Sequence, residues 1–203
     1  MFKHHMTKMR NLTRSALSRF GVDERGAAAI EFAFIAPLLI TMYLGTMEIS
    51  QGIEANKKVG RSASIIGDII AQSQTTISVV DVQDILKIGS AIMQPYTRTL
   101  PTITITAINI DAAQAATVAW SHRINGTTFV TSPLVVNSPI TVPANLNIAS
   151  TFLIKVQTSL EYLPLTSWSI QKNRAGNTYA AIDMNETYYL RPRVSTTVAC
   201  PGC

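Results

Sequence analysis

Residues 27–47 read AAAIEFAFIAPLLITMYLGTM, an apolar run that contains one carboxylate, Glu31. The run has the length of a membrane-spanning helix, which needs about 20 predominantly apolar residues. A carboxylate inside such a span costs roughly 2.5–3.5 kcal/mol on insertion scales, so it normally has a partner and a function. The run is long for a removable secretory signal, and no A-x-A-like cleavage site follows it. A plain uncleaved anchor is the main alternative, but it gives Glu31 no role.

The residues just before the run suggest a partner for Glu31. Cleavage after Gly26 would free the α-amino group of Ala27, which lies four residues before Glu31 and on the same helix face. An α-amino group titrates near about 7.7–8 and therefore carries substantial positive charge at neutral pH. The new helix N-terminus would also favour a negative charge in its first turn. Further along, Pro37 is expected to kink the helix because it removes one backbone hydrogen bond.

These residues carry a resemblance to a known family. Arg25-Gly26 followed by AAAIEF resembles the class III signal of type IV pilins and pseudopilins, with a basic leader, a glycine at the cut and a glutamate as fifth mature residue. The continuation EFAFIAP from Glu31, together with YYLRPR at residues 188–193, is similar to TadE-like proteins of tight-adherence (Tad, or Flp) pilus systems. The resemblance implies cleavage by a prepilin peptidase between Gly26 and Ala27. Ala27 stands where type IV pilins carry Phe, which leaves N-methylation open.

Charge is concentrated before the apolar run. Residues 1–26 contain six of the 17 Lys and Arg residues and two of the 12 acidic residues, so the rest of the chain is nearly neutral. Basic residues beside a span usually stay in the cytoplasm. We therefore expect residues 1–26 to form a cytoplasmic leader, residues 27–47 to cross the bacterial inner membrane and residues 48–203 to form a periplasmic domain. No aromatic or groove-reading pattern accompanies the charge, so no nucleic-acid partner is expected.

Helical periodicity continues beyond the span. Apolar residues recur at roughly helical spacing up to residue 70, with charged residues largely elsewhere. Four glycines fall within an arc of about 80° on one helix face; they are Gly45, Gly52, Gly60 and Gly67. They indicate either tight packing against a neighbouring subunit or sheet, or breaks in a frayed helix. A second helix is expected at about residues 81–94, with Asp81 as its N-cap and Pro95 as its end.

The second half of the chain has the alternation of β-strands. Residues 102–110 alternate Thr with Ile almost without error, and residues 118–124 read as a partner strand. Asn125-Gly126 predicts a hairpin turn with a return strand at residues 127–131. Further strands are expected at residues 151–163 and 187–199, with Pro192 marking an edge or a bulge. The predicted fold class is α+β, with a mostly antiparallel sheet. Packing of that sheet on the long N-terminal helix, as in pilins, is implied by the resemblance.

The chain ends in Cys200-Pro201-Gly202-Cys203, a C-x-x-C motif that is open to three interpretations. A structural disulfide suits an oxidising compartment. A redox pair would need the first Cys at a helix N-terminus, and a zinc site would need about four ligands. The motif follows a predicted strand and has no ligand partners at suitable spacing, so Cys200 and Cys203 are disulfide candidates. We expect no metal site, no cofactor and no enzymatic activity.

The resemblance implies a TadE-like minor pilin or pseudopilin that serves pilus assembly and thereby cell adhesion. Its partners would be a prepilin peptidase, other pilins or pseudopilins, Tad inner-membrane assembly proteins and the lipid bilayer. Glu31 would pair with the amine of Ala27 in its own or a neighbouring subunit. Whether the protein enters the extracellular filament or only primes it stays open. The alternatives are a type II secretion pseudopilin and a membrane-anchored periplasmic thiol–disulfide protein that uses Cys200 and Cys203.

Overall fold

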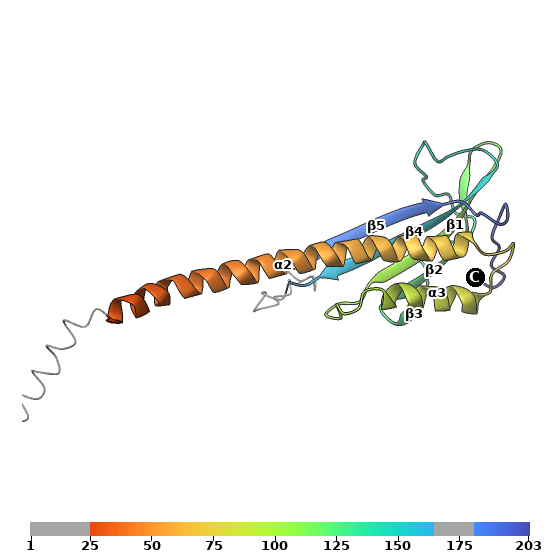
Figure 1. The fold of residues 1–203 in the computed structure, drawn as a ribbon. Coiled ribbons are helices and arrows are strands. Elements are labelled where there is room, and N and C mark those ends of the chain that lie inside the picture. The colour runs from red at the N-terminus through yellow and green to blue at the C-terminus, as the bar shows by residue number, and fades with distance from the viewer. Residues whose placement is uncertain (1–24, 165–180) are drawn as a thin grey trace, which may run out of the picture. The chain divides into compact units, whose positions relative to one another are not determined.

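The computed structural model describes residues 25–164 and 181–203 (Figure 1). The chain divides into two units, Met1–Met47 and Glu48–Cys203, called here the first and the second unit. The leader predicted for residues 1–26 lies almost entirely outside the described residues.

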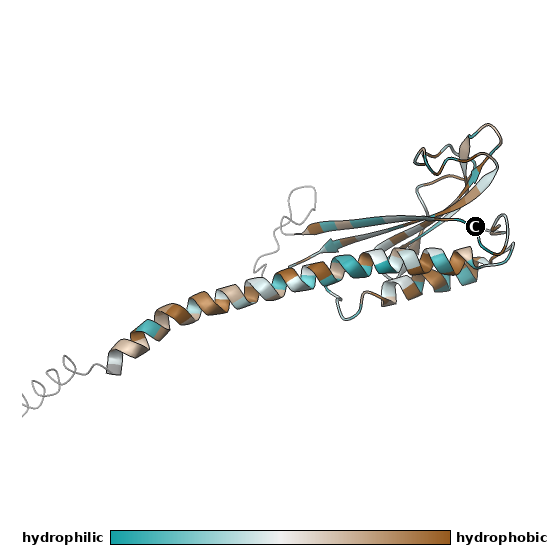
Figure 2. Ribbon diagram, turned by 45° about the horizontal axis from the view of Figure 1, so that its top comes forward, coloured by the Kyte–Doolittle hydropathy of each residue, from teal (hydrophilic) through white to brown (hydrophobic). Residues whose placement is uncertain are grey.

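The described part of the first unit belongs to helix α2 (Arg25–Ala71). Its large apolar side chains, from Ile30 to Met47, are exposed instead of forming a core. Most of this part of α2 carries the brown of hydrophobic residues in Figure 2. By length and composition this helix can cross a membrane, and none of its most apolar window is buried. The predicted long apolar N-terminal helix is therefore present, and its crossing of a membrane fits its length and composition.

The second unit is built on a five-stranded antiparallel sheet with the order β3-β2-β1-β4-β5. Its strands are β1 (Thr102–Ile110), β2 (Ala116–Asn125), β3 (Thr128–Val130), β4 (Thr151–Tyr162) and β5 (Ile182–Leu190). The strand with the clearest Thr/Ile alternation, β1, is central and is paired on both sides. That position explains why seven of its nine residues are buried.

Two helices pack on the same face of this sheet (Figure 1). The end of α2 contributes Ala63, Ile66 and Ile70, and α3 (Val79–Ala91) contributes Val82 and Leu86, all fully buried. They meet the inward-facing residues of β1, β2 and β4, namely Ile103, Ile105, Ala107, Trp120, Ile124, Ile154 and Val156. The α+β, pilin-like fold class predicted from the sequence is therefore confirmed.

Three glycines of α2 face the sheet of the same chain. Gly52 lies 3.8 Å from the Tyr162 ring, measured from the position of an added Cβ, and Gly60 lies 3.6 Å from the Tyr188 hydroxyl. A Cβ on Gly67 would collide with Leu190 Cδ1. Helix α2 runs through all three positions without a break. The packing interpretation of these glycines is therefore correct, and the interpretation as helix breaks is wrong.

The start of α3 differs from the prediction. Ser78, not Asp81, is the N-cap, and its hydroxyl accepts a hydrogen bond from the Asp81 N–H over 3.1 Å. Asp81 occupies N3 and its carboxylate accepts from the Ser78 N–H, which completes a capping box. This reciprocal arrangement satisfies two backbone N–H groups, those of Ser78 and Asp81, whereas Asp81 acting alone as the N-cap would not form the reciprocal pair.

Two predicted β features are also shifted. The hairpin between β2 and β3 has Gly126 and Thr127 as its central residues, because Asn125 pairs with Thr128. Gly126 has φ 63°, which suits the first central position of a type II′ turn. The last strand was expected at residues 187–199 but occupies Ile182–Leu190. It ends before Pro192, which lacks the N–H that a longer ladder requires.

Candidate functional site

The residues predicted to serve cleavage and assembly all lie at the start of α2. Gly26, Ala27 and Glu31 are exposed, and an added Cβ at Gly26 would meet nothing within 4 Å. Since α2 is continuous here, Ala27 and Glu31 lie one turn apart on the same helix face. The helix therefore holds Glu31 on the same face as Ala27, as pairing with a freed Ala27 amine requires. The pairing itself, which requires cleavage, stays a prediction.

Polar groups within the span bond internally. Pro37 lies inside α2, and its carbonyl accepts a hydrogen bond from Thr41 Oγ1 over 2.8 Å. Thr46 Oγ1 donates in the same way to the Met42 carbonyl over 2.9 Å. Such bonds satisfy hydroxyls in a bilayer that offers no water. The kink expected at Pro37 stays a prediction.

A second cluster, which the sequence did not reveal, lies where the second unit begins. Tyr162, at the end of β4, donates a hydrogen bond from its hydroxyl to Glu48 Oε1 over 2.7 Å. The ring of Tyr96 stacks on that of Tyr162, with centroids 5.2 Å apart. The Tyr96 hydroxyl accepts from the Leu163 N–H over 2.8 Å. Burial of the Tyr162 hydroxyl, the hydrogen bond to Glu48 and the negative charge of Glu48 together raise the Tyr162 pKa above its usual range.

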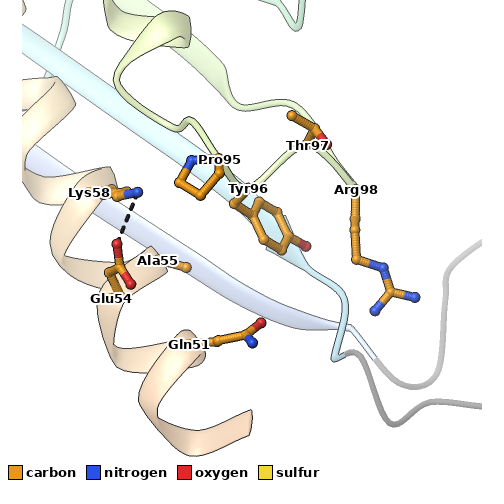
Figure 3. A pocket seen from close by; sticks show the side chains of 8 residues that line it. All are labelled: Gln51, Glu54, Ala55, Lys58, Pro95, Tyr96, Thr97 and Arg98. Carbon is orange, nitrogen blue, oxygen red and sulfur yellow. Dashed lines mark ion pairs between the residues drawn. The ribbon is translucent and has the colours of Figure 1, made fainter. Parts of the chain in front are cut away.

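Beside this cluster is a pocket of about 330 Å³ (Figure 3). Lys58 Nζ lies 3.0 Å from Glu54 Oε1 and also donates to the Gln94 carbonyl. On the other wall, Arg98 Nη1 donates to the Leu163 and Pro164 carbonyls. The cations are therefore engaged in holding residues 94–98 between α2 and the end of β4. This arrangement is suited to holding the fold together and contains no nucleophile–base pair.

Cys200 and Cys203 form a disulfide, with their Cα atoms 5.4 Å apart. They follow an isolated parallel bridge between Thr76 and Ala199, and Trp120 Nε1 donates to the Val198 carbonyl over 2.8 Å. The pair sits in a turn after that bridge, and an added Cβ on Gly202 would lie 3.6 Å from Val79 Cγ2 at the start of α3. The two sulfurs are bonded to each other, so neither is a reactive thiolate in this structure. Within residues 25–164 and 181–203, no group of three or more His, Cys, Asp or Glu side chains is arranged to bind a metal.

His122 is the one histidine among the residues that the structure describes. It lies on the helix-facing side of β2, opposite Ile105, and burial lowers its pKa. Its Nε2 is buried, with no hydrogen-bond partner within the described parts of the chain. A neutral imidazole in a core face is a packing residue, so His122 has no assigned chemistry.

Residues 26–64 match the family model described as TadE-like protein. This chain carries a TadE-like segment. The match begins at Gly26, includes Ala27, Glu31 and Pro37, and ends inside α2 before the sheet. The resemblance stated from the sequence is thus confirmed for the anchor segment. Comparison with curated proteins and with solved structures found no match.

The TadE-like segment and the one long apolar helix among the described residues fit a membrane-anchored protein associated with pilus assembly. The sheet lies entirely outside the matched residues.

Proposed function

We propose that the protein is a minor pilin or pseudopilin of a tight-adherence pilus, processed by a prepilin peptidase between Gly26 and Ala27. The observation that carries this proposal is the TadE-like match, which begins at Gly26 and runs through the anchor. The exposure of Gly26, with open space around its Cα, supports access by a peptidase. The protein acts as a structural subunit, and we assign it no enzymatic activity.

The mechanism that we propose is assembly through the anchor. After cleavage, Glu31 is the fifth residue and accepts the positive charge of the Ala27 amine, in its own or a neighbouring subunit. The exposed apolar side chains of the span then pack with those of other pilins or pseudopilins in the membrane. A charge pair in that apolar setting favours one register, because any other register leaves the carboxylate without its partner. Tad inner-membrane proteins are the proposed assembly partners.

The proposed orientation has the N-terminus in the cytoplasm and the second unit in the periplasm. It is supported by the six basic residues in residues 1–26. A reporter that is active only in the periplasm should be active when fused after Cys203 and inactive when fused at Asn11. The opposite pattern would refute the orientation and the periplasmic partners with it.

Processing is tested by intact-mass measurement of the full chain extracted from membranes that contain a prepilin peptidase. We expect the mass of a chain that begins at Ala27. Gly26→Val should block the cut, because a branched side chain does not fit where glycine lies against the peptidase. Gly45→Val is the matched control, since Gly45 lies in the same helix and also has open space around it. Persistence of residues 1–26 in wild type would overturn the proposal.

Two alternatives differ in their partners and their chemistry. A type II secretion pseudopilin would be processed in the same way, so cross-linking to Tad components, with none to secretion components, distinguishes the two. The TadE-like match favours the Tad assignment. A thiol–disulfide protein would require Cys200 to be a reactive thiolate. A measured reduction potential in the range of redox enzymes would favour that alternative.

A further inference from the structure

An apolar groove opens beside the first turns of the second unit. It has a volume of about 420 Å³ and is lined mainly by Ile49, Gly52 and Ile53 of α2 and by Tyr162, Ile182 and Met184 of the sheet. Ile49 is 67 % exposed, and Ile53 and Ile182 are each 53 % exposed. Three branched apolar side chains from two distant segments therefore surround one groove without being buried by the described parts of the chain. An apolar surface of this kind marks an interaction site when it is contiguous.

The contacts of the groove fix its place in the second unit. Ile182 pairs with Tyr162 across β4 and β5, and Tyr162 bonds Glu48, the first residue of the second unit. The apolar run of the anchor ends one residue earlier, at Met47. The groove thus lies at the end of the second unit that the chain enters directly from its membrane span.

Side-chain character changes along α2 in a way that matches a membrane surface. Ile49, Ile53 and Lys57 are four residues apart and lie on one helix face. They follow Glu48 along the helix by about 1.5, 7.5 and 13.5 Å. A headgroup layer is about 5–8 Å thick on each side of the hydrocarbon core. For a helix near the bilayer normal, the two isoleucines fall within that layer. The backbone of Lys57 lies about 5–8 Å beyond it, and its long side chain can extend back toward the phosphates.

The charges around the groove agree with a phospholipid occupant. Glu54 is paired with Lys58, and Glu48 accepts the Tyr162 hydrogen bond. Within the described residues, Lys57 forms no ion pair and is exposed at the rim of the groove. Apolar side chains below an available cation fit the boundary between acyl chains and phosphates. A second protein chain would need an apolar segment with an acidic group opposite Lys57.

We propose that this groove, formed by Ile49, Ile53 and Ile182 with Lys57 at its rim, holds the second unit against the lipid headgroup layer and takes up phospholipid. The surface is separate from the assembly role of Glu31, and it depends only on membrane anchoring. While the protein is in the membrane, lipid covers the groove. Entry into a filament would require that lipid to leave.

The test uses the full chain reconstituted alone in vesicles of phosphatidylethanolamine and phosphatidylglycerol. A bimane label is attached at Ile182→Cys, with Cys200 and Cys203 left as their disulfide. The quencher is a lipid that carries a nitroxide in the headgroup region. Ile182 is the informative position because it belongs to the sheet and not to the anchor helix. Val194→Cys is the matched control: it is also exposed, and its neighbour Arg193 bonds Ala71, about 35 Å along α2 from Glu48.

We expect quenching at residue 182 to exceed that at residue 194 by about two-fold or more, as for a side chain at the depth of an interfacial helix. The pair Ile49→Ser and Ile53→Ser should reduce the quenching at residue 182, and both sites are exposed enough for the fold to tolerate it. Equal quenching at the two labels would overturn the proposal. The proposal would also be overturned if the label at residue 182 became less quenched as the protein density rose and copies of the chain cross-linked to one another. Because no pilus component is present, failure here leaves the proposed function untouched.

Discussion

Tyr162 and Glu48 are 114 residues apart in the sequence, yet the tyrosine hydroxyl donates to the carboxylate over 2.7 Å. The bond joins the last residue of β4 to the first residue of the second unit. Tyr162 is 1 % exposed, and its ring stacks on that of Tyr96. The contact ties the sheet to the helix at the point where the chain leaves its membrane anchor.

Removing the Tyr162 hydroxyl should destabilise the second unit. We expect Tyr162→Phe to lower the free energy of unfolding by about 1–2 kcal/mol, since the donor is buried and its acceptor is charged but partly exposed. Thermal unfolding in detergent, followed by circular dichroism, measures the change. Tyr188→Phe is the control, because Tyr188 is 39 % exposed on β5 and donates no hydrogen bond within the described chain. An equal effect of the two variants would contradict the assigned role.

The same bond predicts a loss of stability in alkali. Burial and Glu48 raise the pKa of Tyr162 above that of a free tyrosine, which is about 10. The stability that the protonated Tyr162 hydroxyl contributes is fully present below about pH 10. It falls at higher pH, because the unfolded chain then releases a proton that the folded chain retains. Tyr162→Phe cannot ionise and should lose less stability between about pH 9 and 11. Parallel pH profiles for the two proteins would show that Tyr162 does not titrate differently on folding.

Gly89 is expected to be a packing requirement of α3. A Cβ there would collide with Ile66 Cδ1 on α2 and would lie 2.8 Å from Ile103 Cδ1 on β1. Ser62 Oγ also donates to the Gly89 carbonyl over 3.0 Å, which holds the two helices close. We predict that Gly89→Ala lowers the free energy of unfolding by about 1–2 kcal/mol despite its better helix propensity. Chemical denaturation gives the value.

A second variant separates the collision from other effects of Gly89→Ala. Ile66→Val deletes the Cδ1 atom that the new methyl group would meet. The double variant should therefore be less destabilised than the sum of the two single changes. Strict additivity would show that the contact with Ile66 is not the cause.

The terminal disulfide should be formed in the native compartment but contribute little stability. Cys200 and Cys203 are three residues apart, so closing their loop constrains the unfolded chain weakly. Alkylation without reductant, followed by mass spectrometry, should leave both cysteines unmodified. The double change to Ser should lower stability by about 2 kcal/mol or less. Finding both thiols alkylated would exclude the disulfide.

Local patterns determined the elements that could be predicted from the sequence. The Thr/Ile alternation of residues 102–110 predicted β1 because β1 is central and one residue in two faces the helices. The N-terminal anchor was equally clear, since the length and apolar composition of residues 27–47 are enough to predict a membrane-spanning helix. The position of β5 was missed because its register is set by nine pairings to β4, which no local pattern encodes. Asp183 and Glu186 also weaken its strand signal.

The candidate sites also differ in whether a local sequence pattern encodes them. Gly26, Ala27 and Glu31 form a local motif within one helical turn, so the sequence was sufficient to find them. The cluster around Tyr162 joins residues from α2, the loop before β1 and the end of β4, and it exists only after folding. The glycines of α2 were visible as a stripe, but their partners, Tyr162, Tyr188 and Leu190, required the structure.

Glu31 gives the most direct test of the assembly mechanism. We predict that Glu31→Gln is still cleaved after Gly26 but assembles poorly. Glutamine keeps the size and hydrogen-bonding capacity of the side chain, but it cannot offset the charge of the Ala27 amine. That amine would then lie at the membrane edge without a close counter-charge. The measurements are intact mass for cleavage, and pilus yield with cross-linking of the anchor to neighbouring pilins for assembly.

Shorter and neutral replacements at Glu31 separate charge from shape. Glu31→Asp keeps the charge but reaches the Ala27 amine less well, so it should assemble partly. Glu31→Ala removes both charge and shape and should resemble Glu31→Gln, because the missing charge is the cause in each. The order Asp above Gln and Ala is expected in both pilus yield and cross-linking. Wild-type assembly in Glu31→Ala would mean that the carboxylate has no partner, and the anchor would then be a passive one.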